Sequence, residues 1–311
     1  MAAAGANPAD PPGDPELSAR FDLVPTLRER TAVVPLTGGI TNRNFRIDTP
    51  QGAYVARVSS PDSTLLAIDR AVEHTNSLAA AASGAAPNVV DYSAAAGILV
   101  VQFVVGRTFG DDDIRDPAQL PRIAAACRSL HSGPAFTNEF NMFRIQERYL
   151  QVILERGLRL PPGYQSYADQ VAAMEQVLRQ NPCPLVPCNN DLLAANMIDD
   201  GSRLWLIDYE YSGNNDACFE LGNIWSEANL PLPLLEKLVT AYHGTPSPRL
   251  VARSRLWALM SKYGWTLWAC IQDGTSTIDF DFWAWGLQKY ERAVLEFQSP
   301  QFAELLKQAS D

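Results

Sequence analysis

The polar residues with the clearest chemical potential lie within residues 187–223. Asp191 and Asn196 have the spacing D-x-x-x-x-N, and Asp208 follows a short apolar run, residues 204–207, that is typical of a buried strand. In phosphoryl transfer to a hydroxyl, one Asp accepts or orients the proton of the attacking group, while an Asn and a second Asp hold Mg²⁺ against the phosphates. Mg²⁺ is a hard cation that prefers such oxygen ligands. The pattern therefore indicates phosphoryl transfer, although a polar turn before a strand also produces these spacings.

Four blocks of sequence follow one another along the chain: LTGGITNRNFRI, CNNDLLAANMI, LIDYEYSGNNDACFELGN and WTLWACIQDGTSTIDFDFWAW. Together they resemble the choline/ethanolamine kinases, within the wider aminoglycoside-phosphotransferase-like group, from about Leu36 to Tyr290. The resemblance implies a bilobal α+β protein-kinase-like fold, with a small β-rich N-lobe and a larger, mainly helical C-lobe. It places ATP between the lobes, Asp191 as the catalytic base, and Asn196, Asp208 and Glu210 at the Mg²⁺ site.

The loop before Asp191 departs from the usual pattern of that family. Its members usually have His two residues before the catalytic Asp, and this chain has Asn189. If that His only braces the loop by hydrogen bonds, Asn can replace it. If the His does more, the chain is a pseudokinase, a module that binds ligand without turnover. Glu220, where family members often have Asp, is expected to brace the same loop.

Segments nearer the start are expected to bind the nucleotide. Residues 32–47 have a strand-turn-strand pattern in which glycines let the backbone approach a phosphate closely, although a plain hairpin has the same signature. Arg57 is the single base of a β-rich run at residues 53–58, and a helix glutamate is its candidate partner. The resemblance places adenine at a hinge over residues 102–106. The residues predicted to bind the cofactor are Gly38, Gly39, Thr41, Asn42, Asn44, Arg57, Glu73, Gln102 and Val104.

Aromatic side chains are concentrated in residues 263–290, although they make up only 9% of the chain. Aromatic faces attract a quaternary ammonium group, but aromatics at helical spacing also form ordinary cores. The resemblance assigns the choline pocket to Trp265, Trp268, Phe282 and Trp285, and it places Glu227 near the ammonium. The predicted substrate is therefore choline or a related amino alcohol. Kinases for ethanolamine, thiamine or an aminoglycoside are the alternatives. Because a primary ammonium prefers carboxylates and a trimethylammonium prefers an aromatic wall, the tryptophans favour choline.

Composition excludes several other classes of protein. The chain has 311 residues, 47% of them hydrophobic, and a net charge of −10, which argues against binding to a nucleic acid backbone. It has neither an apolar run of 18 residues nor a basic and apolar leader, so a cytoplasmic location is expected. Five cysteines without C-x-x-C spacing and three scattered histidines favour neither a zinc site nor a Ser-His-Asp hydrolase. Cys188 has no His nearby in the sequence and is interpreted as buried and inert.

The chain is expected to have three regions. Residues 1–16 are predicted to be a disordered tail, residues 17–105 the nucleotide-binding N-lobe, and residues 106–311 the catalytic and substrate-binding C-lobe. Strands are predicted at residues 32–36, 53–58, 89–92 and 98–105, and helices at residues 69–82, 121–131, 142–156 and 167–180. The acidic run at residues 111–113 is predicted to be a solvated loop that caps the next helix.

Overall fold

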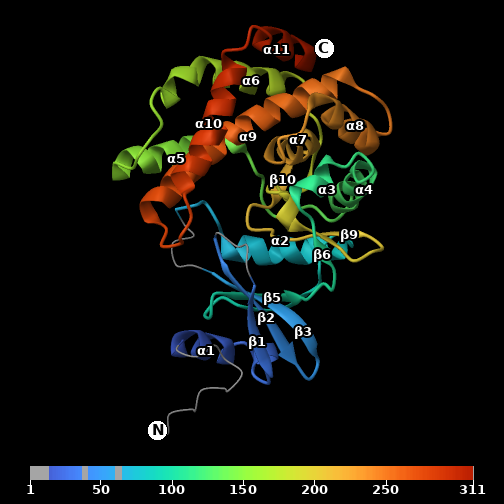
Figure 1. Cartoon of the computed structure of the whole chain (residues 1–311), viewed down its shortest axis with the longest axis vertical. Helices are drawn as coiled ribbons and strands as arrows, with labels where there is room; N and C mark the ends of the chain where they lie inside the picture. The colour runs from blue at the N-terminus through green and yellow to red at the C-terminus, as the bar shows by residue number, and fades with distance from the viewer. Residues whose placement is uncertain (1–13, 37–40, 60–64, 311) are drawn as a thin grey trace.

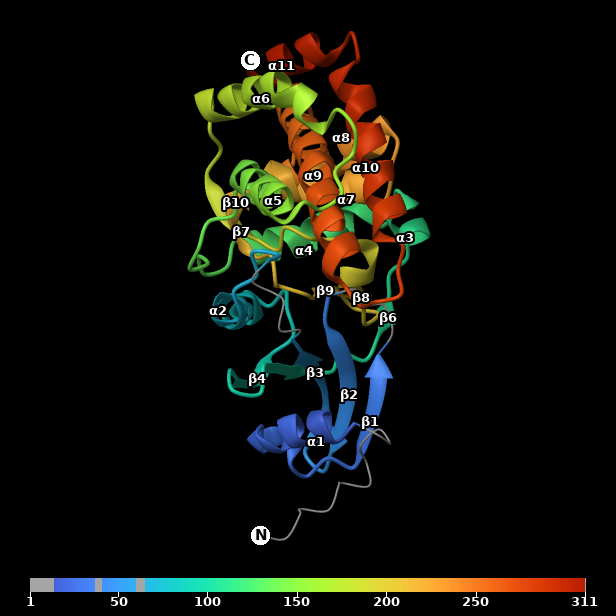
Figure 2. The ribbon, with the colours of Figure 1, turned by 90° about the vertical axis from the view of Figure 1, so that its left-hand side faces the viewer.

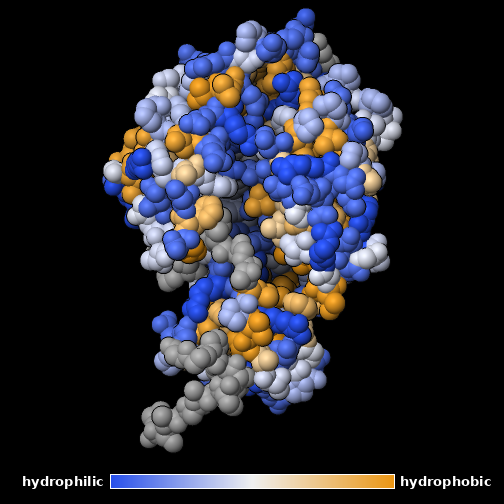
Figure 3. All heavy atoms as spheres, viewed as in Figure 1, coloured by the Kyte–Doolittle hydropathy of each residue, from blue (hydrophilic) through white to orange (hydrophobic). Residues whose placement is uncertain are grey.

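The computed structural model describes residues 14–36, 41–59 and 65–310, which form a small β-rich part and a larger helical part (Figure 1). The two parts meet at a waist, where the molecular outline narrows in the space-filling view (Figure 3). The C-terminal helix α11 (Phe302–Ser310) lies at the end of the molecule that is farthest from the small part. Sheet and helices are therefore largely segregated along the long axis, as the α+β prediction requires.

A five-stranded antiparallel sheet forms the small part, in the strand order β1-β2-β3-β5-β4. Successive side chains of a strand point to opposite faces. In β3, Ala56 and Val58 are therefore buried against the N-terminal helix, whereas Val55 and Arg57 line a cavity on the other face. The elements are α1 (Pro15–Asp22), β1 (Ala32–Leu36), β2 (Arg43–Thr49), β3 (Gly52–Val58), β4 (Val89–Ser93) and β5 (Ile98–Gln102).

Helix α2 (Arg70–Ala82) lies across the waist (Figure 1). Asp69 caps its N-terminus, because Oδ1 accepts hydrogen bonds from the backbone nitrogens of Ala71 (2.9 Å) and Val72 (3.1 Å). The cap fixes where the first turn begins, and it leaves Glu73 buried on the side that faces Arg57. A local capping signal thus positions the predicted partner of the β3 base.

Helix α9 (Pro248–Thr275) is the centre of the larger part, and α5, α7, α10 and α11 pack against it (Figure 2). It is 28 residues long, yet neither it nor any other helix in the described ranges is apolar enough to cross a membrane. Gly222 lets α7 approach α9 closely, since a Cβ there would lie 2.1 Å from the carbonyl oxygen of Ser254. The other helices are α3 (Asp111–Arg115), α4 (Leu120–His131), α5 (Met142–Arg156), α6 (Ala168–Gln180), α7 (Ala217–Glu227), α8 (Leu232–His243) and α10 (Phe282–Phe297).

Two short sheets on the waist side of these helices hold the segment that contains the predicted acids. One pairs β7 (Leu185–Cys188) with β10 (Gly213–Asp216), and the other has the order β6-β8-β9. Its strands are β6 (Arg107–Thr108), β8 (Met197–Asp199) and β9 (Leu204–Leu206). Asp191 lies three residues beyond the end of β7, and Asp208 two residues beyond the end of β9. Both acids are therefore placed by strands that belong to the larger part.

Most predicted elements are confirmed, but three predictions were wrong. Helix α1 begins at Pro15, inside the predicted tail, of which residues 1–13 lie outside the described residues. The acidic run forms the first turn of α3, because Asp113 caps the backbone nitrogen of Gly110 at 2.8 Å. Strand β5 ends at Gln102, before the predicted end of the strand. Helix α6 begins at Ala168, after a short 3₁₀ turn, which agrees with its predicted range to within one residue.

Asp216 connects α7 to α9 through a buried ion pair. Its carboxylate accepts hydrogen bonds from Arg253 Nε, from Trp257 Nε1 (3.0 Å) and from the backbone nitrogen of Cys218 (2.9 Å). The side chains of Asp216 and Arg253 are each only 3% exposed. The helix that ends at Glu227 is thereby tied to the helix that contains Trp265 and Trp268.

Replacing Asp216 by Asn would leave the guanidinium of Arg253 buried without its counter-ion. We expect the free energy of unfolding to fall by about 3–5 kcal/mol, which urea unfolding followed by circular dichroism would measure. The exposed Asp112 provides the control, because Asp112→Asn should change this free energy by less than about 0.5 kcal/mol. Equal stability of the two variants would show that the pair contributes nothing.

Candidate active site

Hydrogen bonds to the side chains of Glu220 and Asn189 hold the loop that contains Asp191. The carboxylate of Glu220 accepts from the backbone nitrogens of Asn189 (3.0 Å) and Asn190 (2.7 Å). The amide nitrogen of Asn189 donates to the carbonyl oxygens of Ile207 (3.0 Å) and Asp208 (2.9 Å), and its Oδ1 accepts from the backbone nitrogen of Asp191 (3.1 Å). Asn189 thus braces both acidic segments, which is the bracing role that an Asn can take over from His.

Asn196 and Asp208 lie side by side at the boundary of two cavities, since both line each of them. The amide nitrogen of Asn196 donates to the carbonyl oxygen of Asp191 (2.7 Å), so its side-chain oxygen is the atom left to ligate a cation. Asp208 has a φ of +66°, in the left-handed region that non-glycine residues rarely adopt. Such backbone strain persists where the surrounding structure enforces it, and it is concentrated at functional sites.

Two arginines and three carboxylates form a network across the waist. Arg57 contacts Asp208 (2.5 Å) and Glu73 (3.2 Å), so the predicted Arg57–Glu73 pair is present. Arg70, which sequence reasoning missed, contacts Glu73 (2.7 Å) and Glu210 (3.1 Å). Its spacing of three residues from Glu73 on one helix was the available signal. The network therefore joins β3 and α2 to the segment after β9.

Burial within this network changes the acidity of its members. Burial raises the pKa of Glu210 to about 7, and the charge of Asp208 adds to the effect, while Arg57 and Arg70 oppose it. Burial alone would lower the pKa of Arg57, but the carboxylates of Asp208 and Glu73 raise it above its usual value. Asn42 Nδ2 donates to Glu210 at 2.8 Å. Glu210 is thus held by neutral and cationic donors together.

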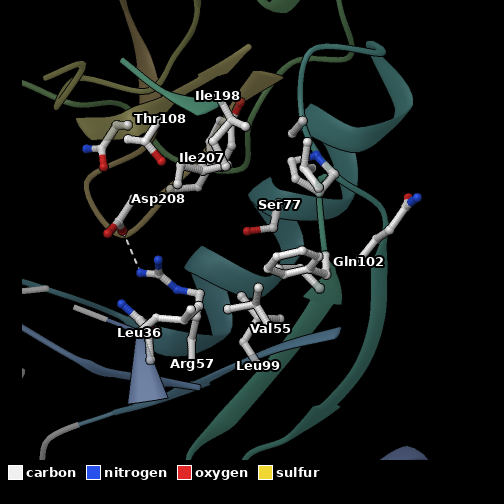
Figure 4. A pocket seen from close by; sticks show the side chains of 18 of the residues that line it. Leu36, Val55, Arg57, Ser77, Leu99, Gln102, Thr108, Ile198, Ile207 and Asp208 are labelled. Atoms are coloured by element: carbon white, nitrogen blue, oxygen red, sulfur yellow. Dashed lines mark hydrogen bonds and ion pairs between the residues drawn. The ribbon is translucent and has the colours of Figure 1, made fainter. Parts of the chain in front are cut away.

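The larger cavity, of 430 Å³, lies between the sheet and the β6-β8-β9 strands. Figure 4 shows Arg57 reaching toward Asp208 at one end and Gln102 at the other, with Val55, Leu99 and Ile207 along the walls. An apolar slot with charged groups at one end is typical of a nucleotide site. Of the residues predicted to bind the cofactor, five line this cavity: Asn44, Arg57, Glu73, Gln102 and Val104. Thr41 and Asn42 line the smaller cavity instead, and Gly38 and Gly39 lie outside the described residues.

The smaller cavity, of 80 Å³, adjoins the larger one and has aromatic and acidic walls. The smaller cavity is lined by three tryptophans, Trp265 and Trp268 of α9 and Trp285 of α10. The acids Asp191 and Glu227 also line it. Burial raises the pKa of Asp191 well above its usual value, and the charges of Asp208, Glu227 and Glu210 add to this effect. A carboxylate in such a place is a stronger base than a solvated one.

Two aromatic residues of α10 lie outside the wall of the smaller cavity. Phe282, which was predicted to line a substrate pocket, packs edge-on against Trp268, with ring centroids 5.7 Å apart. It therefore supports Trp268 from behind. Trp283 packs against the guanidinium of Arg159, which lies 3.5 Å from its ring centroid.

Lys289 is a second residue that sequence reasoning missed. Its Nζ donates to both carboxylate oxygens of Glu227 at 2.5 Å, and it lies 4.1 Å from the ring centroid of Trp285. Lys289 follows Trp285 by four residues, so both lie on one face of α10. That spacing was visible in the sequence, but the contact with α7 was not.

The environment of Cys188 confirms that the residue is buried, but it adds a neighbour that the sequence does not reveal. His131 Nε2 lies 3.6 Å from Cys188 Sγ and 3.5 Å from Glu220, and His131 Nδ1 lies 2.7 Å from the hydroxyl of Tyr242. The thiol therefore has a histidine neighbour, 57 residues away in the sequence. Burial raises the pKa of the Cys188 thiol well above its usual value, so the group remains protonated and belongs to the structural support of the loop.

Comparisons with known proteins identify the family and the fold of this chain. The model of the phosphotransferase enzyme family matches residues 32–257. Ethanolamine kinase 2 of Mus musculus is 28% identical over 288 residues, which cover 82% of this chain and 73% of that protein. The crystal structure of a choline/ethanolamine kinase family protein from Mesorhizobium loti has a TM-score of 0.81 and 30% identity, covering 94% of this chain and 97% of that one. Choline kinase LicA from Streptococcus pneumoniae has a TM-score of 0.76 and 24% identity over 90% and 97% of the two chains. The predicted bilobal protein-kinase-like fold is confirmed.

Proposed function

This chain belongs to the phosphotransferase enzyme family, as a relative of the choline/ethanolamine kinases, and from that premise we propose that it phosphorylates choline or a related amino alcohol with Mg-ATP. One observation carries the proposal. Asp191 and three tryptophans line a small cavity that shares Asn196 and Asp208 with a larger, nucleotide-sized one. An alcohol in the smaller cavity would thus meet a phosphate in the larger cavity beside the proposed base.

The larger cavity is proposed to hold ATP between two lobes. These are the nucleotide-binding lobe, residues 17–105, and the catalytic and substrate-binding lobe, residues 106–311. Its apolar walls suit adenine next to Gln102 and Val104, and Arg57 suits the phosphates at the other end. The side-chain oxygen of Asn44 is buried without a hydrogen-bond partner among the described residues, although Asn44 lines both cavities. A bound group that carries an N–H or O–H at this boundary would provide the missing donor.

Asn196 and Asp208 are the proposed Mg²⁺ ligands, and Glu210 lies on the same wall of the smaller cavity. The donor set fits the ion, because it consists of an amide oxygen and carboxylates. When bound, Mg²⁺ would neutralise phosphate charge. Asp191 would take the proton from the substrate hydroxyl as that oxygen bonds to the terminal phosphorus of ATP and the bond to ADP breaks.

The smaller cavity is proposed to bind the substrate. Three indole rings line it, and each face that meets a quaternary ammonium contributes roughly 0.5–2 kcal/mol. The volume of 80 Å³ favours a small alcohol over a multi-ring aminoglycoside. Ethanolamine is the second candidate, because the chain is similar to an ethanolamine kinase and because Glu227 lies on the wall.

The first experiment is ADP release with Mg-ATP and each of choline, ethanolamine, thiamine and an aminoglycoside. Turnover with choline and not with the others would support the full proposal. Turnover with another alcohol would retain the chemistry of Asp191 and discard the assignment of the aromatic pocket. Thermal stabilisation by Mg-ATP without turnover of any alcohol would favour a pseudokinase.

Trp285→Ala is expected to raise the KM for choline by about 2- to 30-fold, because one aromatic face of the pocket is lost. The KM for ATP should change by less than about twofold, since Trp285 lines only the smaller cavity. Trp283→Ala is a matched control two residues away on the same helix, and it should alter neither KM. Equal effects of Trp285→Ala on both KM values would remove the aromatic pocket from the proposal.

A further inference from the structure

Glu227, an acid in the wall of the smaller cavity, already has a cation of the protein as its partner. This cation is Lys289, which pairs with Glu227 without lining the cavity itself. The ammonium of Lys289 donates to both oxygens of Glu227 and lies over the ring of Trp285. The side chains of Lys289 and Glu227 are only 7% and 11% exposed. A carboxylate and an aromatic face are the two groups that a substrate ammonium would use, and here both contact a lysine.

The acids that line the smaller cavity differ in whether they have an ion-pair partner. Asp208 is paired with Arg57, Glu210 with Arg70, and Glu227 with Lys289. Asp191 is the acid on these walls that has no ion pair within the described part of the chain. The proposed base is therefore left without a counter-ion, whereas the charge of Glu227 is neutralised by Lys289.

Primary and quaternary ammonium groups respond differently to such a wall. A primary ammonium carries three N–H donors and requires acceptors when it leaves water. A quaternary ammonium has no N–H donor and is held by aromatic faces. Because both oxygens of Glu227 accept from Lys289, a primary ammonium could bind there only beside a second cation or by displacing it.

We propose that Lys289 determines the substrate specificity of this pocket, by occupying Glu227 and so favouring a quaternary over a primary ammonium. This inference rests on the proposed function, because it concerns the same cavity. A separate hydrogen bond joins the two helices that contain Lys289 and Glu227. Arg292 NH2 of α10 donates to the carbonyl oxygen of Ser226, in the last turn of α7, at 2.8 Å. Removing the charge of Lys289 should thus free Glu227 without moving either helix.

The test is Lys289→Met, which keeps the unbranched apolar stem over Trp285 and removes the charge. The ratio of kcat/KM for ethanolamine to kcat/KM for choline should rise about tenfold or more, because a freed carboxylate can bind a primary ammonium. The double variant Lys289→Met with Glu227→Gln should return this ratio toward that of the wild type. Lys289→Arg retains the cation and can donate to both oxygens of Glu227, so it should leave the ratio within about threefold of the wild-type value.

A binding measurement separates this inference from the proposed function. Quenching of tryptophan fluorescence by tetramethylammonium and by methylammonium reports the two affinities without any turnover. The wild type should bind tetramethylammonium more tightly, and Lys289→Met should gain affinity for methylammonium. Lack of turnover with every alcohol would overturn the proposed function and leave these affinities to decide the role of Lys289. An unchanged preference in folded Lys289→Met and in the double variant, by turnover and by binding, would overturn that role.

Discussion

Asp191→Asn is expected to lower kcat by about 10²–10⁴-fold, the usual contribution of a general base. The amide has the same shape as the carboxylate but cannot accept the proton of the hydroxyl. The bond from the backbone nitrogen of Asp191 to Asn189 Oδ1 does not involve the altered side chain, so the loop should keep its conformation. Steady-state ADP release with the alcohol that is turned over would measure kcat.

The KM for ATP should change little in this variant, because Asp191 lines only the smaller cavity. Asp112→Asn, on the exposed surface of α3, is the control and should match the wild type in both constants. If Asp191→Asn retained more than about a tenth of the wild-type kcat, another group would have to accept the proton.

Asp208→Asn is expected to lower kcat/KM for ATP by roughly 100-fold or more, and to increase the Mg²⁺ concentration needed for half-maximal rate. Asn is the appropriate replacement because, like Asp, it tolerates the left-handed φ of +66° found at this position. The amide removes the anionic oxygen proposed to ligate the metal. Titration of activity with Mg²⁺ at fixed ATP would measure the effect.

The fold of the Asp208→Asn variant should survive, because Arg57 keeps its ion pair with Glu73. Unfolding by urea and thermal stabilisation by ATP without metal would verify this. Wild-type activity together with an unchanged Mg²⁺ requirement would refute the assignment of Asp208 as a metal ligand.

Local signals in the sequence marked the acidic segments as candidates, and the resemblance of the surrounding blocks to a known family assigned their roles. The spacing from Asp191 to Asn196 and the short strand before Asp208 are properties of neighbouring residues, and the structure brings all three to the same cavity wall. The pairing of Arg57 with Glu73 was predicted from the resemblance to kinases, in which a base on this strand pairs with a helix glutamate, and the structure contains that pair. Their catalytic and binding roles remain predictions.

Features that depend on packing between distant segments were not predictable in this way. Lys289 and Glu227 are 62 residues apart, and their contact depends on how α7 and α10 meet. His131 reaches Cys188 for the same reason. Helical spacing placed Phe282 on the same face of a helix as Trp285. It could not reveal that Phe282 packs against Trp268 and does not line the smaller cavity.

The hinge segment shows a different limit. Apolar residues continue after β5, so their pattern alone predicted a longer strand than the one that ends at Gln102. The chain instead passes so close to β8 that a Cβ at Gly106 would lie 2.5 Å from the carbonyl oxygen of Asp199. A close approach between backbones leaves no periodic signal in a sequence.

The ion pairs of Arg57 have a consequence for the thermodynamics of nucleotide binding. Its side chain is 10% exposed and is held by Asp208 from one part of the molecule and by Glu73 from the other. The rotamer entropy of this arginine is therefore lost when the chain folds and not when a phosphate arrives. A phosphate that took the place of Asp208 would exchange one anion for another, and it would leave the aspartate free for the proposed metal site.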